Sequence, residues 1–330
     1  MPEAGRPLIL VNPTASRLAD DGRRARIVAD IEAAVVARTG VAADVETAVS
    51  IDDARASLER AADERRALVV VAGGDGTVRE AAHDLAGSGI GLGIVPLGTA
   101  NLFAASVGIP LAASRAIATI AEGRFRSVDI GRARWTRADG DTEERLFAVA
   151  CGAGFDARLM AATSSGAKRR FGRYGYFMTA VGMLPSIRGF EASIVVDGER
   201  HELEAVAVLI ANAGQLIPGV VRPALPIRVA DGLLDVIVVA AGGLGGAAIG
   251  AIEALGRRAL GRSATGRSLR LLGAHVRVET SPAQQLEVDG DVVGVGALEA
   301  ACLPSALRIV VPRVRDSRAG PPARPHDTAT

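Results

Sequence analysis

A run of small residues, Gly73 to Thr77, separates two segments that favour different secondary structures. Residues 67–72 form a continuous apolar run, Ala-Leu-Val-Val-Val-Ala, which is typical of a strand buried on both faces of a parallel sheet. Residues 78–85 carry apolar side chains at helical spacing. Glycines at such a turn let the backbone approach a ligand and direct free N–H groups at it. The run therefore predicts a strand–turn–helix unit that binds phosphate without the lysine of a P-loop.

Two side chains of this run add chemistry that a plain tight turn lacks. Asp75 can bind a metal ion that bridges phosphate oxygens, and the Thr77 hydroxyl can donate to one of them. Similar residues follow two other expected strands: residues 12–16 read Asn-Pro-Thr-Ala-Ser, and residues 97–101 read Leu-Gly-Thr-Ala-Asn. Because ligands bind at the carboxyl edge of open parallel sheets, we expect these loops and Thr47 to meet around one nucleotide.

The N-terminal part of the chain alternates strand and helix signals. Strands are expected at residues 7–11, 43–47, 67–72 and 91–96, and helices at residues 23–39, 51–65, from residue 77, and at 111–122. This repeated order predicts an α/β fold with a parallel sheet and helices on both of its faces.

Strand signals replace this alternation from about residue 127 onward. Strands are expected at residues 132–136, 144–150, 192–196, 205–211, 233–239, 268–272, 276–280 and 307–311, and helices near 173–187 and 246–260. The turn at residues 139–141, Asp-Gly-Asp, predicts a hairpin between the first two strands. The segment from residue 313 is polar and rich in proline, and we expect it to be disordered.

Composition argues against several classes of protein. The 38 Lys and Arg residues balance 37 Asp and Glu residues, and aromatic residues make up 3%, so we expect no nucleic-acid partner. Two cysteines, Cys151 and Cys302, indicate free thiols in a cytoplasmic protein, and residues 8–11 are too short for a signal peptide. Residues 232–255 are apolar enough to span a membrane, but the glycines at 242–246 favour a buried strand, a turn and a packed helix.

The remaining motifs have two readings each. Residues 243–248 fit a dinucleotide-binding fingerprint, but no clear acidic ribose partner follows, which favours helix–strand packing. Asp231-Gly232 is a β-turn or a metal site with Asp231 as ligand. Asp289-Gly290-Asp291 is a hairpin turn or the source of a general base. The histidines show no metal-ligand spacing and are given no role: His83, His201, His275 and His326.

Taken in order, these motifs resemble the bacterial diacylglycerol kinase and sphingosine kinase-like lipid kinases over roughly residues 7–312. The motifs that carry the resemblance are Asn12-Pro13, Gly73 to Thr77 with Glu80, residues 96–101, residues 152–157, Asp231 to Asp235, and Asp289-Gly290-Asp291. The first three are shared with NAD kinases and, more distantly, with 6-phosphofructokinases. The last three, in this order, single out the lipid kinases.

The resemblance implies two domains with the active site between them. Residues 1–126 would form an α/β ATP-binding catalytic domain of the NAD kinase and 6-phosphofructokinase type. Residues 127–312 would form an antiparallel β-sandwich-like domain for the acceptor, followed by the tail at 313–330.

The resemblance also implies roles for individual residues. Asp75 would be tied to the catalytic Mg²⁺, and Asp291 would take the proton from the acceptor, with Asp289 as the alternative. A structural Mg²⁺ would bind Asp231 and the carbonyls of Arg228 and Leu233. The residues expected around ATP are Asn12, Pro13, Thr14, Ala15, Ser16, Thr47, Gly73, Gly74, Asp75, Gly76, Thr77, Glu80 and Thr99.

Three positions depart from the family pattern. Ala15-Ser16 stands where Ser-Gly is usual, Leu102 stands where many members have Asp, and Asp291 replaces the commoner Glu. The change at position 102 removes a carboxylate near the acceptor, and the shorter Asp291 must approach more closely. These departures leave the fold untouched and put the identity of the lipid in doubt.

The expected activity is ATP-dependent phosphorylation of a lipid hydroxyl, such as that of diacylglycerol, by in-line transfer assisted by Mg²⁺ and a carboxylate base. An apolar cleft would hold the acyl chains, with residues 174–184 as a candidate wall, and the basic residues 168–173 are a solvated face or a contact with anionic lipid. A cytoplasmic enzyme of this kind would touch the membrane only transiently. The alternatives are an NAD kinase and a catalytically silent nucleotide-binding regulator. The acceptor lipid and the oligomeric state, including a homodimer, stay open.

Overall fold

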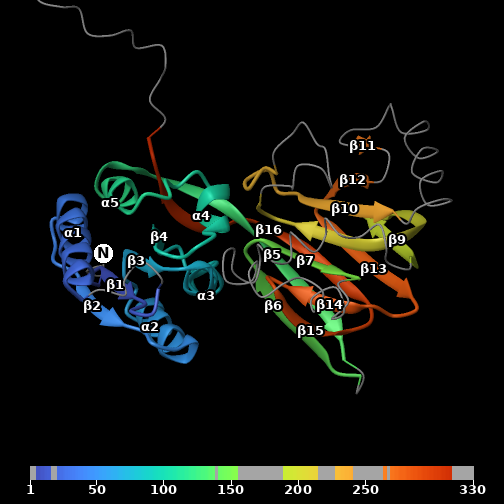
Figure 1. The fold of residues 1–330 in the computed structure, drawn as a ribbon, viewed down its shortest axis with the longest axis horizontal. Coiled ribbons are helices and arrows are strands. Elements are labelled where there is room, and N and C mark those ends of the chain that lie inside the picture. Colours follow the sequence, from blue (N-terminus) through green and yellow to red (C-terminus); the bar gives the residue numbers. More distant parts are fainter. Residues whose placement is uncertain are drawn as a thin grey trace, which may run out of the picture.

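The computed structural model describes residues 5–15, 21–137, 140–154, 189–214, 227–240, 263–265 and 268–313. An α/β part and a part built of strands lie side by side (Figure 1). The site described below lies where these two parts meet.

Four parallel strands form the sheet of the α/β part, in the order β2-β1-β3-β4. The strands are β1 (Leu8–Val11), β2 (Asp44–Thr47), β3 (Leu68–Gly73) and β4 (Gly91–Pro96). The helices are α1 (Asp21–Thr39), α2 (Ile51–Asp63), α3 (Asp75–Leu85), α4 (Leu102–Ser106) and α5 (Ala113–Glu122). Alternate side chains of β1 and β3 enter two cores, one with α1 and α5 and the other with α2 and α3. Helices therefore cover both faces of the sheet, as predicted.

The N-termini of α2 and α3 are built differently, and the difference bears on ligand binding. The Ser50 hydroxyl accepts a hydrogen bond from the Asp53 amide at 3.1 Å, and the Asp53 carboxylate accepts one from the Ser50 amide at 3.0 Å. This capping box satisfies the first N–H groups of α2. The N-cap residue of α3 is Gly74, which offers no side-chain cap. The first turn of α3 is therefore left able to bind an anion.

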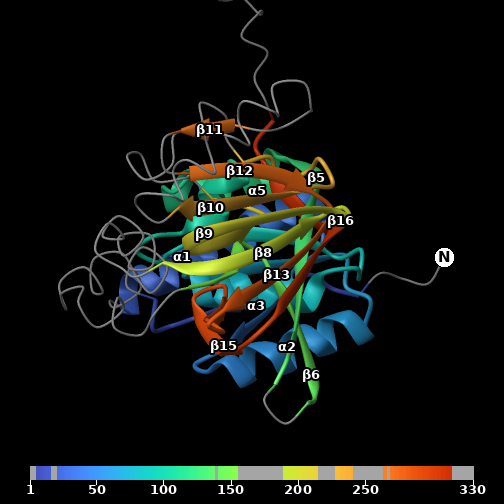
Figure 2. The same ribbon diagram turned by 90° about the vertical axis from the view of Figure 1, so that its right-hand side faces the viewer.

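Antiparallel strands make up the second part and enclose a separate core. They are β5 (Arg124–Thr136), β6 (Thr142–Phe147), β7 (Ala150–Ala153), β8 (Phe190–Val196), β9 (Glu199–Ala211), β10 (Leu234–Ala240), β11 (Ser263–Thr265), β12 (Ser268–Gly273), β13 (His275–Ser281), β14 (Gln285–Val288), β15 (Asp291–Val295) and β16 (Leu298–Val311). In Figure 2 the strands β12, β10, β9, β8 and β13 follow one another across one sheet. Strand β7 pairs with β9, β14 with β7, and β15 with β14, and the tip of the hairpin β14–β15 contacts α3.

Strand β16 joins the two parts. It pairs with β5 along most of its length and with β13, both antiparallel. Near its end Arg308 and Ile309 pair in parallel with Gly91 and Leu92 of β4. The parallel sheet and the antiparallel sheet are therefore continuous, and the predicted domain limits at residues 126 and 127 fall within β5.

Most of the expected elements are present, with shifted ends. The strand expected at residues 307–311 begins at Leu298, and the strand expected at 132–136 begins at Arg124. The expected hairpin joins β5 and β6, and both cysteines are free and buried. The elements α4, β7, β11, β14 and β15 are short and were not expected as separate elements. The expected helices near 173–187 and 246–260 and the tail after residue 313 lie outside the described residues.

The apolar stretch at residues 232–255 begins as expected with a buried strand, β10. Its residues 241–255, which contain the glycines, lie outside the described residues. Within the part of the chain that the structure describes, no helix has the length and apolar character needed to cross a membrane.

Candidate functional site

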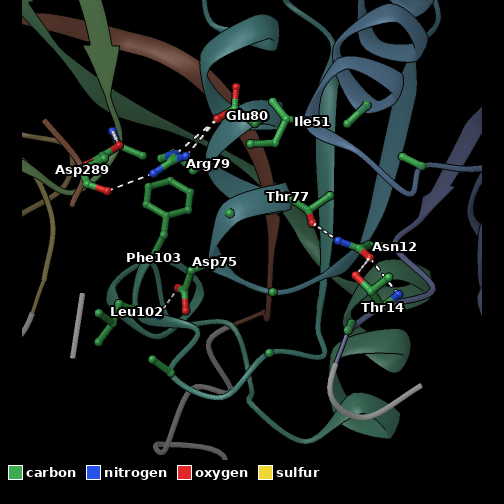
Figure 3. A pocket seen from close by; sticks show the side chains of 18 of the residues that line it. Asn12, Thr14, Ile51, Asp75, Thr77, Arg79, Glu80, Leu102, Phe103 and Asp289 are labelled. Atoms are coloured by element: carbon green, nitrogen blue, oxygen red, sulfur yellow. Dashed lines mark hydrogen bonds and ion pairs between the residues drawn. The ribbon is translucent and has the colours of Figure 1, made fainter. Parts of the chain in front are cut away.

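A cavity of about 560 Å³ lies between the α/β part and the strand-rich part (Figure 3). Its described lining includes most of the residues expected around ATP: Asn12, Thr14, Ala15, Gly74, Asp75, Gly76, Thr77, Glu80 and Thr99. The other part contributes Ala148, Val149 and Asp289. Pro13, Thr47 and Gly73 adjoin lining residues without being among them, and Ser16 lies outside the described residues. The structure thus brings together the three loops that the sequence predicted to converge.

The loop after β1 is tied to the glycine run by Asn12. The Asn12 amide nitrogen donates to the Thr77 hydroxyl at 2.9 Å. The Asn12 amide oxygen accepts from the Thr14 amide at 2.9 Å and from the Thr14 hydroxyl at 2.7 Å. The nitrogen and the oxygen of the Asn12 side-chain amide therefore together hold the first loop against the start of α3.

The glycine run and the loop after β4 meet backbone to backbone. A Cβ atom on Gly98 would lie 2.6 Å from the Gly74 Cα atom and 2.9 Å from the Asn101 side-chain oxygen. No side chain fits between the two loops at that separation. A Cβ atom on Gly76 would meet nothing within 4 Å, so the outer side of the turn is open to a ligand. The glycines thus serve close packing at one position and ligand access at another.

Asp75 ties the glycine run to α4. Its carboxylate accepts hydrogen bonds from the Asn101 amide at 2.7 Å and the Leu102 amide at 2.6 Å. Burial raises the pKa of Asp75, and these backbone hydrogen bonds oppose the rise. The backbone amides of Asp75 and Phe103 also contribute, so the predicted Mg²⁺ contact would share the carboxylate with these donors. Asn101 itself has a φ of 51° and bonds through its side chain to both backbone groups of Gly98.

Asp289 occupies the tip of the hairpin β14–β15. Asp289 and Gly290 have φ values of 46° and 88°, and Val288 pairs with Asp291, as in a two-residue type I′ turn. The Asp289 carboxylate accepts from the amides of Ala148, Val149 and Ala150 at 2.8, 2.9 and 3.0 Å. His83 Nε2 lies 3.2 Å from the same carboxylate.

These contacts set the ionisation of Asp289. Its side chain is 2% exposed, and burial alone would raise its pKa. The hydrogen bond and charge of His83 and the backbone amides outweigh burial, so the pKa of Asp289 lies below its ordinary value. The four contacts also occupy the four lone-pair directions of a carboxylate. An acceptor hydroxyl can reach Asp289 only when one of these contacts opens.

Asp291, the expected base, is held by two arginines. Its carboxylate lies 3.2 Å from Arg79 Nη1 and 3.2 Å from Arg145 Nη1. Arg79 also donates to the Asp289 carbonyl at 3.0 Å and lies 3.1 Å from the Glu80 carboxylate, whose side chain is 3% exposed. Asp291 is not among the described residues that line the cavity. The ion pairs of these arginines with Asp291 and Glu80 instead link α3 with the hairpin β14–β15.

The comparisons with known proteins agree with this geometry. Residues 6–133 match the diacylglycerol kinase catalytic domain, and residues 149–311 match the YegS C-terminal NAD kinase beta sandwich-like domain. A probable lipid kinase YegS-like protein of Xanthomonas oryzae is 30% identical over 86% of this chain and 92% of its own length. The chain belongs to this lipid kinase family.

Two further matches add detail on length and fold. An uncharacterized protein of Synechocystis is 33% identical over 77% of the chain, which spans 57% of that protein's length. A solved structure described as a diacylglycerol kinase of Bacillus anthracis superposes with a TM-score of 0.66 at 22% identity, over 93% of this chain and 96% of the other. At that identity the superposition supports the fold alone.

The second metal site predicted for this chain lies away from the cavity. Asp231 is in the turn before β10, where Gly232 has a φ of 76° and its amide donates to Asp129 at 2.7 Å. The Leu233 amide donates to the Asp231 carboxylate at 3.2 Å. Within the described residues no group of three His, Cys, Asp or Glu side chains could hold a metal. A Mg²⁺ ion here would depend on backbone carbonyls such as those of Arg228 and Leu233, so this site stays a prediction.

Two residues at the junction of the two parts were not predicted from the sequence. His83 and Arg79 lie one helical turn apart on α3, and both contact the hairpin β14–β15. Their four-residue spacing shows that they share a face of the helix. Nothing in the sequence indicated what that face would meet, because His83 and Asp289 are separated by 206 positions.

Proposed function

We propose that this chain is an ATP-dependent kinase that phosphorylates the hydroxyl group of diacylglycerol or a related lipid alcohol. The observation that carries the proposal is the cavity between the two parts, because it joins a nucleotide-phosphate site to Asp289 of the acceptor domain. Membership of the lipid kinase family supports the choice of a lipid as acceptor.

The nucleotide side follows from the uncapped start of α3. The phosphates of ATP would lie against the backbone of Gly74 to Thr77, where free N–H groups and the helix dipole favour negative charge. At another part of the cavity lining, Ala48, Val49 and Ile51 supply apolar surface suited to the adenine base. Mg²⁺ would bind beside Asp75 and neutralise charge on the transferred phosphoryl group.

The acceptor side favours Asp289 over Asp291 as the carboxylate that takes the proton. Asp289 lines the cavity, whereas Asp291 is not among the lining residues and is bound by Arg79 and Arg145. Among the contacts of Asp289, the one with His83 is the longest, at 3.2 Å. Loosening of that contact would free one lone pair for the acceptor proton while the three amides keep the carboxylate in place.

Product analysis with labelled ATP tests the proposal. The purified chain, ATP and Mg²⁺ are incubated separately with diacylglycerol, sphingosine, ceramide and NAD, and label is followed into each acceptor. We expect label in a lipid, and we expect D289N to lower kcat by at least about a hundredfold, in line with the loss of a general base. The control is E204Q, an exposed position on β9.

Two results would refute the proposal. Label in NAD alone would assign the chain to the NAD kinases instead. An undiminished rate of lipid phosphorylation by D289N would show that Asp289 does not act as the base. Because the lipid acceptor resides in a bilayer, the same assay with vesicles would show the transient membrane contact as sedimentation of the enzyme with lipid.

A further inference from the structure

Strand β14 presents a row of polar side chains on an otherwise apolar face. Its Leu286 and Val288 point into the core of the strand-rich part. Because side chains alternate along a strand, Gln285 and Glu287 share the opposite face. Asp289, in the turn that follows, lines the cavity and lies two residues beyond Glu287, at most about 7 Å along the chain. The row therefore begins at the proposed reaction centre and continues into the acceptor domain.

The neighbouring strands show what this face meets. Glu287 is paired with Gly152 of β7, and Gly152 is paired with Leu209 of β9. Leu209 belongs to the hydrophobic cluster that also contains Phe103 and Ala104 of α4. The face thus looks toward the α/β part. Gly152 itself places no side chain beside Glu287.

Glu287 and Gln285 carry buried oxygen atoms that have no hydrogen-bond partner. Glu287 is 3% exposed, and its Oε2 atom and the Gln285 Oε1 atom are both buried and unpaired. Burial raises the pKa of Glu287 to about 8, and the charges of Asp291 and Asp289 contribute to the rise. At neutral pH the Glu287 carboxyl group is therefore mostly protonated and has an O–H group to donate.

Unpaired buried polar atoms of this kind are costly and uncommon. Leaving one unsatisfied destabilises a protein by about 1–3 kcal/mol, and native structures contain few of them. An apolar residue at position 287 would match its partners Gly152 and Leu209 better. A bound ligand with oxygen atoms at the right places would supply the missing partners.

We propose that Glu287 and Gln285 form a polar subsite for the acceptor lipid, in which Glu287 donates a hydrogen bond to an ester carbonyl of the glycerol backbone. The subsite deepens the proposed function and rests on it. Asp289 would act on the free hydroxyl while Glu287, next along β14, binds the carbonyl of the adjacent ester. The surrounding apolar face would contact the acyl chains. The subsite favours diacyl over dialkyl lipids, because an ether oxygen lacks the exposed carbonyl acceptor.

A comparison of two lipids tests this inference directly. Dioleoylglycerol carries ester carbonyls, and its dialkyl ether analogue has the same hydroxyl and chains without them. We expect the wild-type chain to prefer the ester by about tenfold in kcat/KM, the ratio that one good hydrogen bond provides. E287L should abolish the preference by raising KM for the ester while leaving KM for the ether unchanged. E287Q should preserve it, because its amide N–H donates from the same position.

Two outcomes of this comparison would overturn the subsite, and a third would refute the proposed function as well. An ester preference that survives in E287L would overturn the subsite. Equal losses on both lipids in E287L, with E287Q failing likewise, would show that Glu287 serves only the fold and would also overturn it. No label in either lipid with the wild-type chain would refute the proposed function, and the subsite with it.

Discussion

Replacement of Glu287 by glutamine should stabilise the folded chain, and the gain should depend on pH. The pKa of Glu287 is raised from 4.5 to about 8 by burial, with the charges of Asp291 and Asp289 adding to the effect. Between these values the folded state keeps a proton that the unfolded state releases. Release of this proton favours the unfolded state more strongly as pH rises, so the unfolding free energy of the wild-type chain falls between pH 4.5 and pH 8. E287Q carries no such proton and escapes the loss.

The size of the effect follows from the pKa shift. Each pH unit above 4.5 adds about 1.4 kcal/mol to the difference in unfolding free energy between E287Q and wild type. The difference is therefore about 1 kcal/mol at pH 5 and about 3 kcal/mol at pH 7. It levels off above pH 8, where both states of the wild-type chain have released the proton.

Trp135 provides the assay. It is the single tryptophan of the chain, it is 4% exposed, and it lies beside Gly294 of β15. Urea unfolding followed by Trp135 fluorescence at pH 5, 6 and 7 therefore reports on the sheet that contains Glu287. E204Q, on the exposed face of β9, is the matched control and should change the unfolding free energy little at any of these pH values.

A difference between E287Q and wild type that stays constant from pH 5 to pH 7 would refute the reasoning. It would mean that Glu287 titrates alike in both states, and that its carboxyl group has water or another partner in the folded chain. An E287Q chain that becomes less stable than wild type as pH rises would reverse the sign of the predicted difference in unfolding free energy, and would also refute the reasoning.

Three further predictions concern the cavity. Gly98→Val should abolish the rise in Tm caused by ATP, because its Cβ atom would lie 2.6 Å from the Gly74 Cα atom. Gly76→Ala is the control and should leave the Tm of the free chain unchanged, because its Cβ atom would meet nothing within 4 Å. A rise in Tm with ATP in Gly98→Val would contradict this close contact. His83→Leu should lower kcat with little change in KM for ATP, because burial would raise the pKa of Asp289 without the opposing hydrogen bond and charge of His83. His83→Gln should restore part of kcat, since its amide can still donate to Asp289. Equal kcat in all three chains would exclude a positioning role. Chelation of Mg²⁺ should stop phosphoryl transfer, and Asp231→Asn should remove any rise in Tm caused by Mg²⁺ without ATP; an unchanged rise would place that ion elsewhere.

Local patterns sufficed for the nucleotide side of this chain. The glycine run was predicted to join a buried strand to a helix because both neighbours have clear periodicities, and β3 and α3 are found there. The convergence of the loops after β1, β3 and β4 followed from the parallel order of the strands. The first prediction depends on neighbouring residues alone, and the second depends on the order of the strands.

The acceptor side depended on contacts between distant parts of the chain. Asp289 and Asp291 are two residues apart, and only the resemblance to the lipid kinases ranked Asp291 first as the base. The structure gives them different surroundings, because the β14–β15 turn directs Asp289 to the amides after β6 and leaves Asp291 to Arg79 and Arg145. The short helix α4 was likewise not expected, since its N-terminal amides are bound by Asp75 from another element.

The position of β16 bears on how the chain is made. Strand β4 pairs with β3 on one edge and with Arg308 and Ile309 of β16 on the other. These two residues of β16 are synthesised long after β4 itself. At about 5–20 residues per second, a nascent chain would carry that strand with an open edge for on the order of ten seconds or more. During this time the exposed edge is free to pair with other chains. The α/β part therefore cannot close its sheet during translation until almost the whole described chain has left the ribosome.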